Sequence, residues 1–213
     1  MNADARERAS DDTRARTLAI ACIAVWVVAA ATARLFGIWL AVGGAAIGLG
    51  AAVWILDGAQ ARKLLRPSPR LIVIGVATGA AMTAVTLLLY PLLARHAPFI
   101  APETTLLYAA FRAPSLTVAA IALAPVVIGE ELVWRGVVQA ALVQRLGRAA
   151  GVMFAAVAYA LAHAAIGSAV LVAVALLCGV AWGALRAASK SLVPPLVAHL
   201  VWDALVLFWL PIS

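Results

Sequence analysis

The segment Pro114–Val143 reads PSLTVAAIALAPVVIGEELVWRGVVQAALV and decides the fold class of this chain. A run of this length and apolarity is long enough for a helix that crosses a hydrocarbon core of about 30 Å. It nevertheless contains Glu130, Glu131 and Arg135. Ionisable groups at that depth cost a few kcal/mol or more, so they usually face a cavity or a partner inside the protein. The segment therefore predicts a membrane helix that carries a polar site.

The rest of the chain has the same apolar character. Hydrophobic residues make up 66% of the 213 residues and charged residues only 12%, whereas soluble domains carry about 45–50% and about 25%. We therefore predict an all-α polytopic membrane protein with about seven transmembrane helices. The predicted spans are Leu18–Phe36, Ile38–Leu56, Leu71–Leu93, Pro114–Val143, Ala150–Ile166, Ala169–Leu185 and Pro194–Leu210.

The chain is expected to consist of three parts. Residues 1–17 form a cytoplasmic N-terminal tail without regular structure, residues 18–113 a three-helix membrane part with a loop, and residues 114–213 a four-helix membrane core. The loop Ala94–Ala113 has room for a short interfacial helix, and Pro125 favours a kink just before the two acids. The ionisable groups expected to be buried inside spans all lie in the last part, so we expect the chemistry there.

The net charge of +7 is read as a topology signal. If the N-terminus is cytoplasmic, twelve cations face the cytoplasm and three face the other side. The twelve are Arg6, Arg8, Arg14, Arg16, Arg62, Lys63, Arg66, Arg70, Arg145, Arg148, Arg186 and Lys190, and the three are Arg34, Arg95 and Arg112. The positive-inside rule then predicts an inner (plasma) membrane protein with its N-terminus inside and its C-terminus outside. The lipid bilayer is the expected partner of these cations, and nucleic acid is not.

Cysteines, glycines and tryptophans within the spans are expected to have structural roles. Cys22 and Cys178 are expected to be packing thiols, because a disulfide framework is unlikely inside spans. Glycines four residues apart let helices approach closely within one molecule. Tryptophans are expected mostly as interfacial anchors. The glycine pairs are Gly44 with Gly48, Gly75 with Gly79 and Gly179 with Gly183, and the tryptophans near span ends are Trp39, Trp54 and Trp209.

Helical geometry separates the two adjacent acids. Glu131 and Arg135 lie one turn apart, in the order that favours an i,i+4 ion pair. Glu130 lies about 100° around the helix from Glu131 and has no such local partner. An unpartnered carboxyl in an apolar site is suited to act as a general base. The alternative is that all three groups only hold neighbouring helices together.

Two later spans carry polar pairs at one-turn spacing. Tyr159 and His163 share one helix face, where the imidazole can share a water with Glu130 and take its proton, and Tyr159 can orient the imidazole or pack beneath it. His199 and Asp203 share another face and can donate hydrogen bonds to an oxyanion. Asp203 can donate only if protonated; if ionised, it orients His199 instead.

The depths of these groups constrain a single site. At about 1.5 Å per residue, Glu130 lies about 20 Å from the cytoplasmic end of its span and His199 only about 8 Å into the last one. One shared site therefore requires a tilt, a kink, or an earlier start of the last span near Ser191.

Three motifs follow one another in order along the chain. They are Glu130-Glu131-x-x-x-Arg135, Tyr159-x-x-x-His163 and His199-x-x-x-Asp203. In order and spacing they resemble the motifs of the CAAX-protease and bacteriocin-processing (CPBP) family of glutamic intramembrane endopeptidases, which includes the type II CAAX prenyl proteases. The resemblance covers about Ser115–Leu210, so residues 114–213 are expected to be a CPBP-like catalytic core.

The resemblance assigns roles to these residues. It implies that Glu130 and His163 activate the attacking water and that His199 and Asp203 stabilise the oxyanion. The sequence departs from the common pattern twice, with Tyr159 in place of Phe and Asp203 in place of Asn; an ionised Asp203 would repel the oxyanion. The implied supporting residues are Glu131, Arg135 and Tyr159.

The implied activity is endoproteolysis near the C-terminus or membrane anchor of a membrane-associated protein or peptide. The substrate stays open between a prenylated CAAX-like tail, a bacteriocin leader and a C-terminal sorting signal. No cofactor is expected: imidazoles and carboxylates can bind zinc, but there is no HExxH helix and Arg135 sets a cation against a metal.

Two other functions remain open at this point. One is a non-catalytic peptide-binding immunity or scaffold protein of the same fold. The other is a proton-coupled transporter, which would usually show repeat symmetry and polar groups in both halves. The oligomeric state is not predicted.

Overall fold

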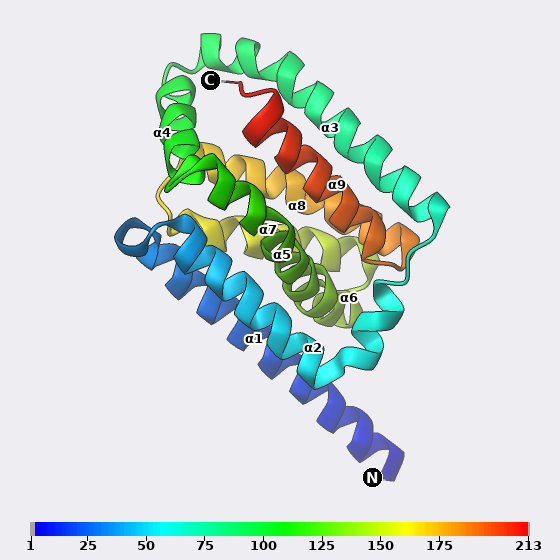
Figure 1. Ribbon diagram of the computed structural model, residues 1–213. Helices are drawn as coiled ribbons and strands as arrows, with labels where there is room; N and C mark the ends of the chain where they lie inside the picture. The colour runs from blue at the N-terminus through cyan, green and yellow to red at the C-terminus, as the bar shows by residue number, and fades with distance from the viewer. Residues whose placement is uncertain (1–2, 213) are drawn as a thin grey trace.

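The computed structural model describes the backbone of residues 3–212 and the side chains of residues 13–212, and the described chain is helical without strands (Figure 1). The predicted all-α fold class is confirmed. In chain order the elements are α1 (Ala3–Phe36), the π-helical turn η1 (Trp39–Gly43), α2 (Gly44–Leu64), α3 (Pro69–His96), α4 (Ile100–Arg112), α5 (Leu116–Glu131), the π-helical turn η2 (Leu132–Val138), α6 (Gln139–Leu146), α7 (Arg148–Ala164), α8 (Ala169–Ser189), α9 (Val193–Ala204) and the π-helical turn η3 (Leu205–Trp209).

Five helical segments are long and apolar enough to cross a membrane. They are Thr13–Phe36, Trp39–Leu64, Pro69–His96, Leu116–Leu146 and Ala169–Ser189. Two shorter apolar segments, Arg148–Ala164 and Val193–Trp209, complete the set. Each of the seven overlaps one predicted span, so the chain is a polytopic helical membrane protein. The loop between the third and fourth spans contains the short helix α4, as expected.

Two predicted boundaries were wrong. The N-terminal tail was expected to lack regular structure, but α1 is helical from Ala3, while residues 1–2 lie outside the described part. The tail is rich in Ala and Arg, which favour helix, and extending an existing helix costs little. The second span was expected to end at Leu56. Asp57 does leave helical geometry there, with φ −146° and ψ 46°, but α2 resumes beyond this kink and ends at Leu64.

Helix α5 lies in the middle of the bundle, between α2 on one side and α9 on the other (Figure 1). Helix α3 packs along α9, and α7 packs along α8. Because the acids at the end of α5 are central, they are surrounded by protein rather than by lipid. The end of the bundle with the C-terminus lies opposite the end with the N-terminus (Figure 1).

Gly129 allows α2 and α5 to touch directly beside the acids. A Cβ atom at this position would collide with the Ala46 carbonyl oxygen, and a Cβ at Gly50 would lie 2.7 Å from the Gly129 Cα. Small residues at such crossings are the usual means by which membrane helices pack closely. The crossing fixes the height of Glu130 in the bundle.

The predicted glycine pairs differ in what they contact. Gly75 and Gly79 lie against α9, where a Cβ would meet Val197 and the Ala198 carbonyl oxygen. Gly179 and Gly183 likewise lie against α7 and Gln139 of α6. Gly44 and Gly48 have no atom near an added Cβ and are exposed. The expectation of packing within the molecule was therefore wrong for that pair, because this face of α2 points away from the bundle.

The start of α9 is buried inside the protein. The Leu192 N–H and the Ser191 hydroxyl both donate to the Leu64 carbonyl oxygen, each at 2.9 Å. Leu192, Pro194 and Pro195 are fully buried. Helix α9 begins at Val193, one residue before the predicted Pro194 and not near Ser191. Its buried start nevertheless lies below the end of the bundle. His199 can then lie at the depth of Glu130.

Helix α4 lies across one end of the bundle and is fastened at both of its ends. At one end the Glu103 carboxylate accepts hydrogen bonds from the Ser168 hydroxyl (2.7 Å) and the Val170 N–H (3.0 Å) at the start of α8. At the other end the Tyr108 hydroxyl donates to the Val206 carbonyl oxygen at 2.7 Å, and Arg112 donates to that of Leu207. These contacts fix α4 over the space between α5, α8 and η3.

Lowering the pH should loosen the Glu103 contact. The hydrogen bonds from Val170 and Ser168 hold the pKa of Glu103 below its ordinary value of 4.5. The contact is therefore fully stabilising above that ordinary value, and its contribution is lost as the pH falls through the lowered pKa. Hydrogen exchange in α4 and the first turn of α8 should speed up in this range. The Glu103→Gln variant should lack this response; an identical response in the variant would assign it to another group.

Candidate active site

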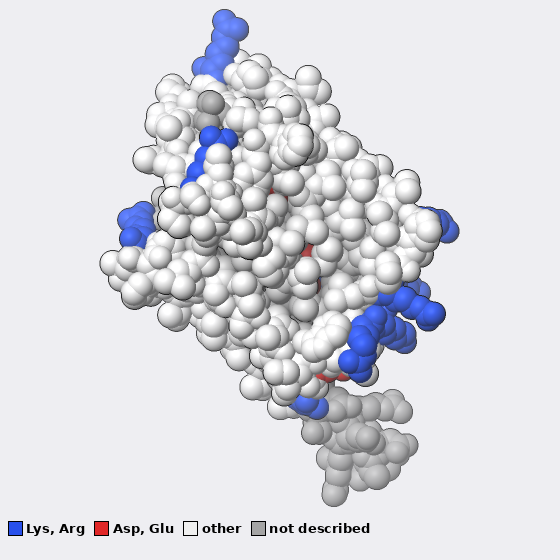
Figure 2. All heavy atoms as spheres, in the orientation of Figure 1, with Lys and Arg blue, Asp and Glu red and all other residues white. Residues whose placement is uncertain are grey.

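Glu130 of α5, His163 of α7 and His199 of α9 line one cavity of about 430 Å³. The cavity also contacts Tyr159 and Asp203. Figure 2 shows a few acidic atoms at the bottom of a hollow in the middle of one face, where the surrounding surface is uncharged. Side chains from three helices far apart in the sequence are thus brought together, as a single site requires.

Glu130 is the acid that faces the cavity. Its side chain is buried, and its Oε2 accepts a hydrogen bond of 3.0 Å from the Tyr159 hydroxyl. The same oxygen lies 3.8 Å from His199 Nε2. The predicted separation of the two acids is therefore confirmed, because Glu131 does not line the cavity. The hydroxyl that distinguishes Tyr159 from Phe serves to hold this carboxylate.

Glu131 and Arg135 form the predicted ion pair beneath the cavity. Glu131 is fully buried, and its Oε1 lies 3.3 Å from Arg135 Nη1. Arg135 lies in the π-helical turn η2 and remains within reach of the acid one turn before it. Its guanidinium also covers the rings of Tyr159 (4.6 Å) and Trp182 (5.2 Å), in cation–π geometry. The pair supports the cavity from below.

His199 is held on both ring nitrogens by acids. Its Nδ1 lies 3.0 Å from Glu131 Oε1, and its Nε2 lies 3.3 Å from Asp203 Oδ2. Two carboxylate acceptors suit an imidazolium, which donates from both nitrogens. The ring also stacks on Trp182, with centroids 3.7 Å apart and planes 19° apart. The contact with Nε2 is the arrangement of the predicted role in which Asp203 orients His199.

His163 presents one free nitrogen. Its Nδ1 lies 2.8 Å from the backbone carbonyl oxygen of Tyr159, which can only accept, so Nδ1 carries the hydrogen. Nε2 is then the basic nitrogen. The Tyr159 ring packs edge-on against the imidazole at a centroid distance of 4.4 Å. Packing of Tyr159 against this imidazole was one of the two predicted arrangements. The ring orientation is therefore fixed from two sides.

Comparison with known families tests the resemblance. Residues 104–205 match the family model described as type II CAAX prenyl endopeptidase Rce1-like. This part of the chain is similar to that family. The match runs from within α4 to the end of α9, contains all the site residues, and agrees with the CPBP resemblance. At this coarse level it supports a CAAX-type intramembrane protease. No curated protein and no solved structure matches the chain.

Three buried tryptophans surround the site and were not predicted as site residues from the sequence. Trp26, Trp134 and Trp182 are fully buried, so the expectation that tryptophans are mostly interfacial anchors was wrong for them. Trp134 packs edge-on against Tyr159, and Trp26 contacts both Trp134 and His163. The position of Trp26 and Trp134 in the middle of predicted spans was a signal, since an interfacial anchor belongs near a span end. Trp182 gave no such signal, because it lies close to the predicted span end at Leu185. Trp209 is exposed at the end of its span, as expected, whereas Trp54 is exposed but lies well before Leu64, where α2 ends.

The positions of the His, Cys, Asp and Glu side chains are relevant to the alternative of a zinc site. Within the described residues, no group of three or more His, Cys, Asp or Glu side chains is arranged to hold a metal ion. The carboxylates are instead committed to Tyr159, Arg135 and His199. A mechanism without a cofactor remains a prediction, which addition of a chelator can test. Cys22 and Cys178 are free, buried thiols, as predicted.

Proposed function

We propose that the protein is a glutamic intramembrane endopeptidase that hydrolyses a peptide bond near the C-terminus or membrane anchor of a membrane-associated substrate. The observation that carries this proposal is the convergence of Glu130, His163 and His199 on one cavity. The Rce1-like match supports the reaction class. The Glu130 carboxylate and the free His163 Nε2 are the two groups that can bind and deprotonate a water.

The proposed hydrolysis has two steps, attack of the water and breakdown of the tetrahedral intermediate. The water oxygen bonds to the carbonyl carbon of the peptide while its proton passes to Glu130. The carbonyl oxygen becomes an oxyanion, which the positive charge of the His199 imidazolium stabilises. The carbon–nitrogen bond then breaks, and the proton on Glu130 passes to the leaving amine. The products are a new C-terminal carboxylate and a new N-terminal amine.

Asp203 has an indirect role in this scheme. Its carboxylate lies 3.3 Å from His199 Nε2, so it holds the ring and favours its charged form. An imidazolium stabilises the oxyanion better than a neutral imidazole, which compensates for the acid near the developing charge. Glu131 fixes the opposite nitrogen of the ring, and Arg135 balances the charge of Glu131.

The His163→Gln variant tests the function. Purified protein in liposomes is given a mixture of N-acylated peptides, and products are identified by mass spectrometry. Loss of the imidazole that binds the attacking water beside Glu130 should reduce the rate by about a hundredfold or more. His96→Gln is the matched control: its Nδ1 contacts the Leu92 carbonyl oxygen as His163 contacts Tyr159, but it is exposed, outside the cavity. His96→Gln should retain the wild-type rate.

The outcomes separate the proposal from its alternatives. Equal rates in His163→Gln and the wild type would overturn the mechanism. Peptide binding without cleavage by the wild type would favour the immunity or scaffold alternative. Loss of activity on adding a chelator, with recovery on adding zinc, would show that a metal is required.

A further inference from the structure

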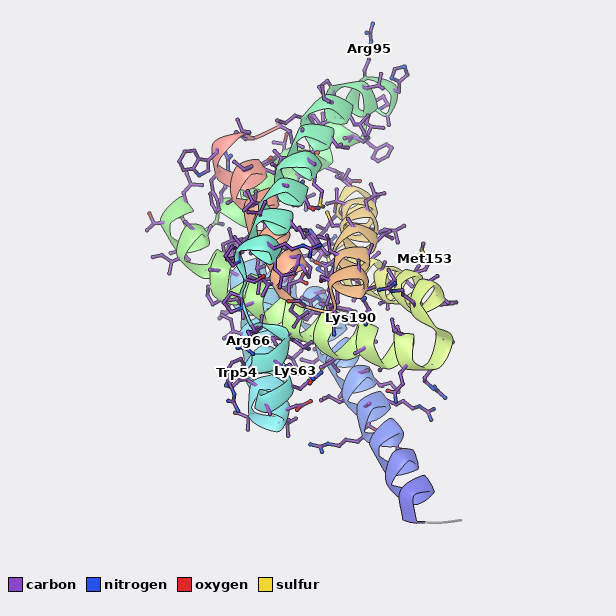
Figure 3. The ribbon with its side chains drawn as sticks, turned by 90° about the vertical axis from the view of Figure 1, so that its right-hand side faces the viewer. Trp54, Lys63, Arg66, Arg95, Met153 and Lys190 are labelled. Atoms are coloured by element: carbon purple, nitrogen blue, oxygen red, sulfur yellow. The ribbon has the colours of Figure 1, made fainter. Side chains whose placement is uncertain are left out.

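The two ends of the bundle differ in charge. Lys63, Arg66 and Lys190 lie at one end, and Arg95 lies at the other (Figure 3). The basic turns α2–α3, α6–α7 and α8–α9 share the first of these ends with the N-terminus. By the positive-inside rule this basic end faces the cytoplasm, and the end with Arg95, α4 and the C-terminus faces outward.

The cavity occupies the half of the bundle away from the basic end. In α3 its lining residues run from Val85 to Leu93, in the half nearer Arg95. In α8 they stop at Trp182, two turns before Lys190. No residue of the basic turns lines the cavity, whereas residues along the length of α4 do. The approach to Glu130 therefore lies on the outward side.

The cavity walls define what can occupy them. Apart from Glu130, Asp203 and the two histidines, the described lining contains no charged residue and no Lys or Arg. A free C-terminal carboxylate would find no lysine or arginine on these walls. Val85, Leu89 and Leu177 line the cavity and are 53%, 47% and 71% exposed, so the cavity is continuous with the membrane-facing surface between α3 and α8. These walls suit an uncharged, apolar stretch of polypeptide.

We propose that the substrate is an exported, membrane-anchored polypeptide, whose apolar stretch reaches Glu130 from the outward half of the bilayer past α3, α4 and α8. This inference rests on the proposed function for the cleavage itself, but the side of access is a property of the cavity. A substrate anchored in the cytoplasmic leaflet would have to cross the basic end, where none of the residues that line this cavity lies. Recognition is then by apolar side chains on both sides of the scissile bond.

Single cysteines can test the side of access without any catalysis. The background is Cys22→Ala with Cys178→Ala, and Ala173→Cys places a thiol on the cavity wall of α8. Ala184→Cys is the matched control, because it lies on the same face of α8 three turns toward the basic end and does not line the cavity. Arg95→Cys and Gln60→Cys, both exposed, mark the two ends. A membrane-impermeant maleimide is applied to spheroplasts and to inverted vesicles.

We expect Ala173→Cys and Arg95→Cys to be labelled in spheroplasts, Gln60→Cys only in inverted vesicles, and Ala184→Cys in neither. Labelling of Ala173→Cys only from the inverted side, or from neither side, would overturn the proposal. So would an exchange of the two end markers. If labelling is as expected but His163→Gln cleaves like the wild type, the proposed function fails while the side of access stands.

The substrate class is tested by protection from labelling. The Ala173→Cys protein also carries Glu130→Gln, so that a bound peptide is not consumed. An N-stearoylated peptide of alanine, valine and leucine, added to spheroplasts, should slow labelling about fivefold once its concentration is about four times its dissociation constant. Arg95→Cys labelling should not change. A peptide with interspersed lysines should not protect; equal protection by both peptides would contradict apolar recognition.

Discussion

Replacing Glu130 with Gln should abolish peptide hydrolysis, with a loss of about 10³-fold or more. The amide has the shape of the carboxyl and can still accept the hydrogen bond from the Tyr159 hydroxyl, 3.0 Å away in the wild type. It cannot take a proton from water. The variant should therefore fold normally and fail only in the chemical step. Single-turnover cleavage of N-acylated peptides in liposomes measures the rate, and circular dichroism checks the fold.

Asp57→Asn is the control for the Glu130 variant. It also exchanges one carboxylate for an amide, but at an exposed position at the kink of α2 that does not line the cavity. It should leave the rate unchanged. A Glu130→Gln protein that cleaves at the wild-type rate would remove the general base from the mechanism.

Replacing Arg135 with Met should destabilise the fold by about 3–5 kcal/mol. Met keeps much of the side-chain volume but leaves the fully buried Glu131 with one cationic partner fewer. The cation–π contacts with Tyr159 and Trp182 are lost as well. The free energy of unfolding in mixed micelles is the measurement. Activity should also fall, because Glu131 holds His199 at 3.0 Å.

Two further variants are compared with Arg135→Met, one as a matched control and one as a partial rescue. Arg145→Met removes an exposed cation from the end of α6 and should change the free energy of unfolding by less than about 0.5 kcal/mol. Adding Glu131→Gln to Arg135→Met should recover part of the lost stability, since it removes the buried charge. If Arg135→Met is as harmless as Arg145→Met, the ion pair does not support the site.

Features set by local helical geometry could be predicted from the sequence. A rotation of 100° per residue separates Glu130 from Glu131, and a spacing of four places Glu131 near Arg135 and His199 near Asp203. All three relationships are present in the structure. The apolar runs were equally informative, because the thickness of the membrane sets the length of a span.

Contacts between helices could not be predicted in the same way. The hydrogen bond from Tyr159 to Glu130 joins α7 to α5, and the contact of Glu131 with His199 joins α5 to α9. Neither follows from spacing along one helix. The depth of His199 depends on a helix start that is buried under Leu64, which hydropathy alone does not show. The expectation that tryptophans lie at the membrane interface also failed for Trp182, which is buried and stacks on the His199 ring.

The central claim is that Glu130 and His163 act on the same water in one site. A double-mutant cycle of single-turnover rates tests it most directly. Groups that act as a unit are strongly non-additive, so the Glu130→Gln/His163→Gln protein should be no slower than the slower single variant. The cycle that pairs Glu130→Gln with His96→Gln should show no coupling. If the losses from Glu130→Gln and His163→Gln instead multiply, the two residues act independently and the single-site account is contradicted.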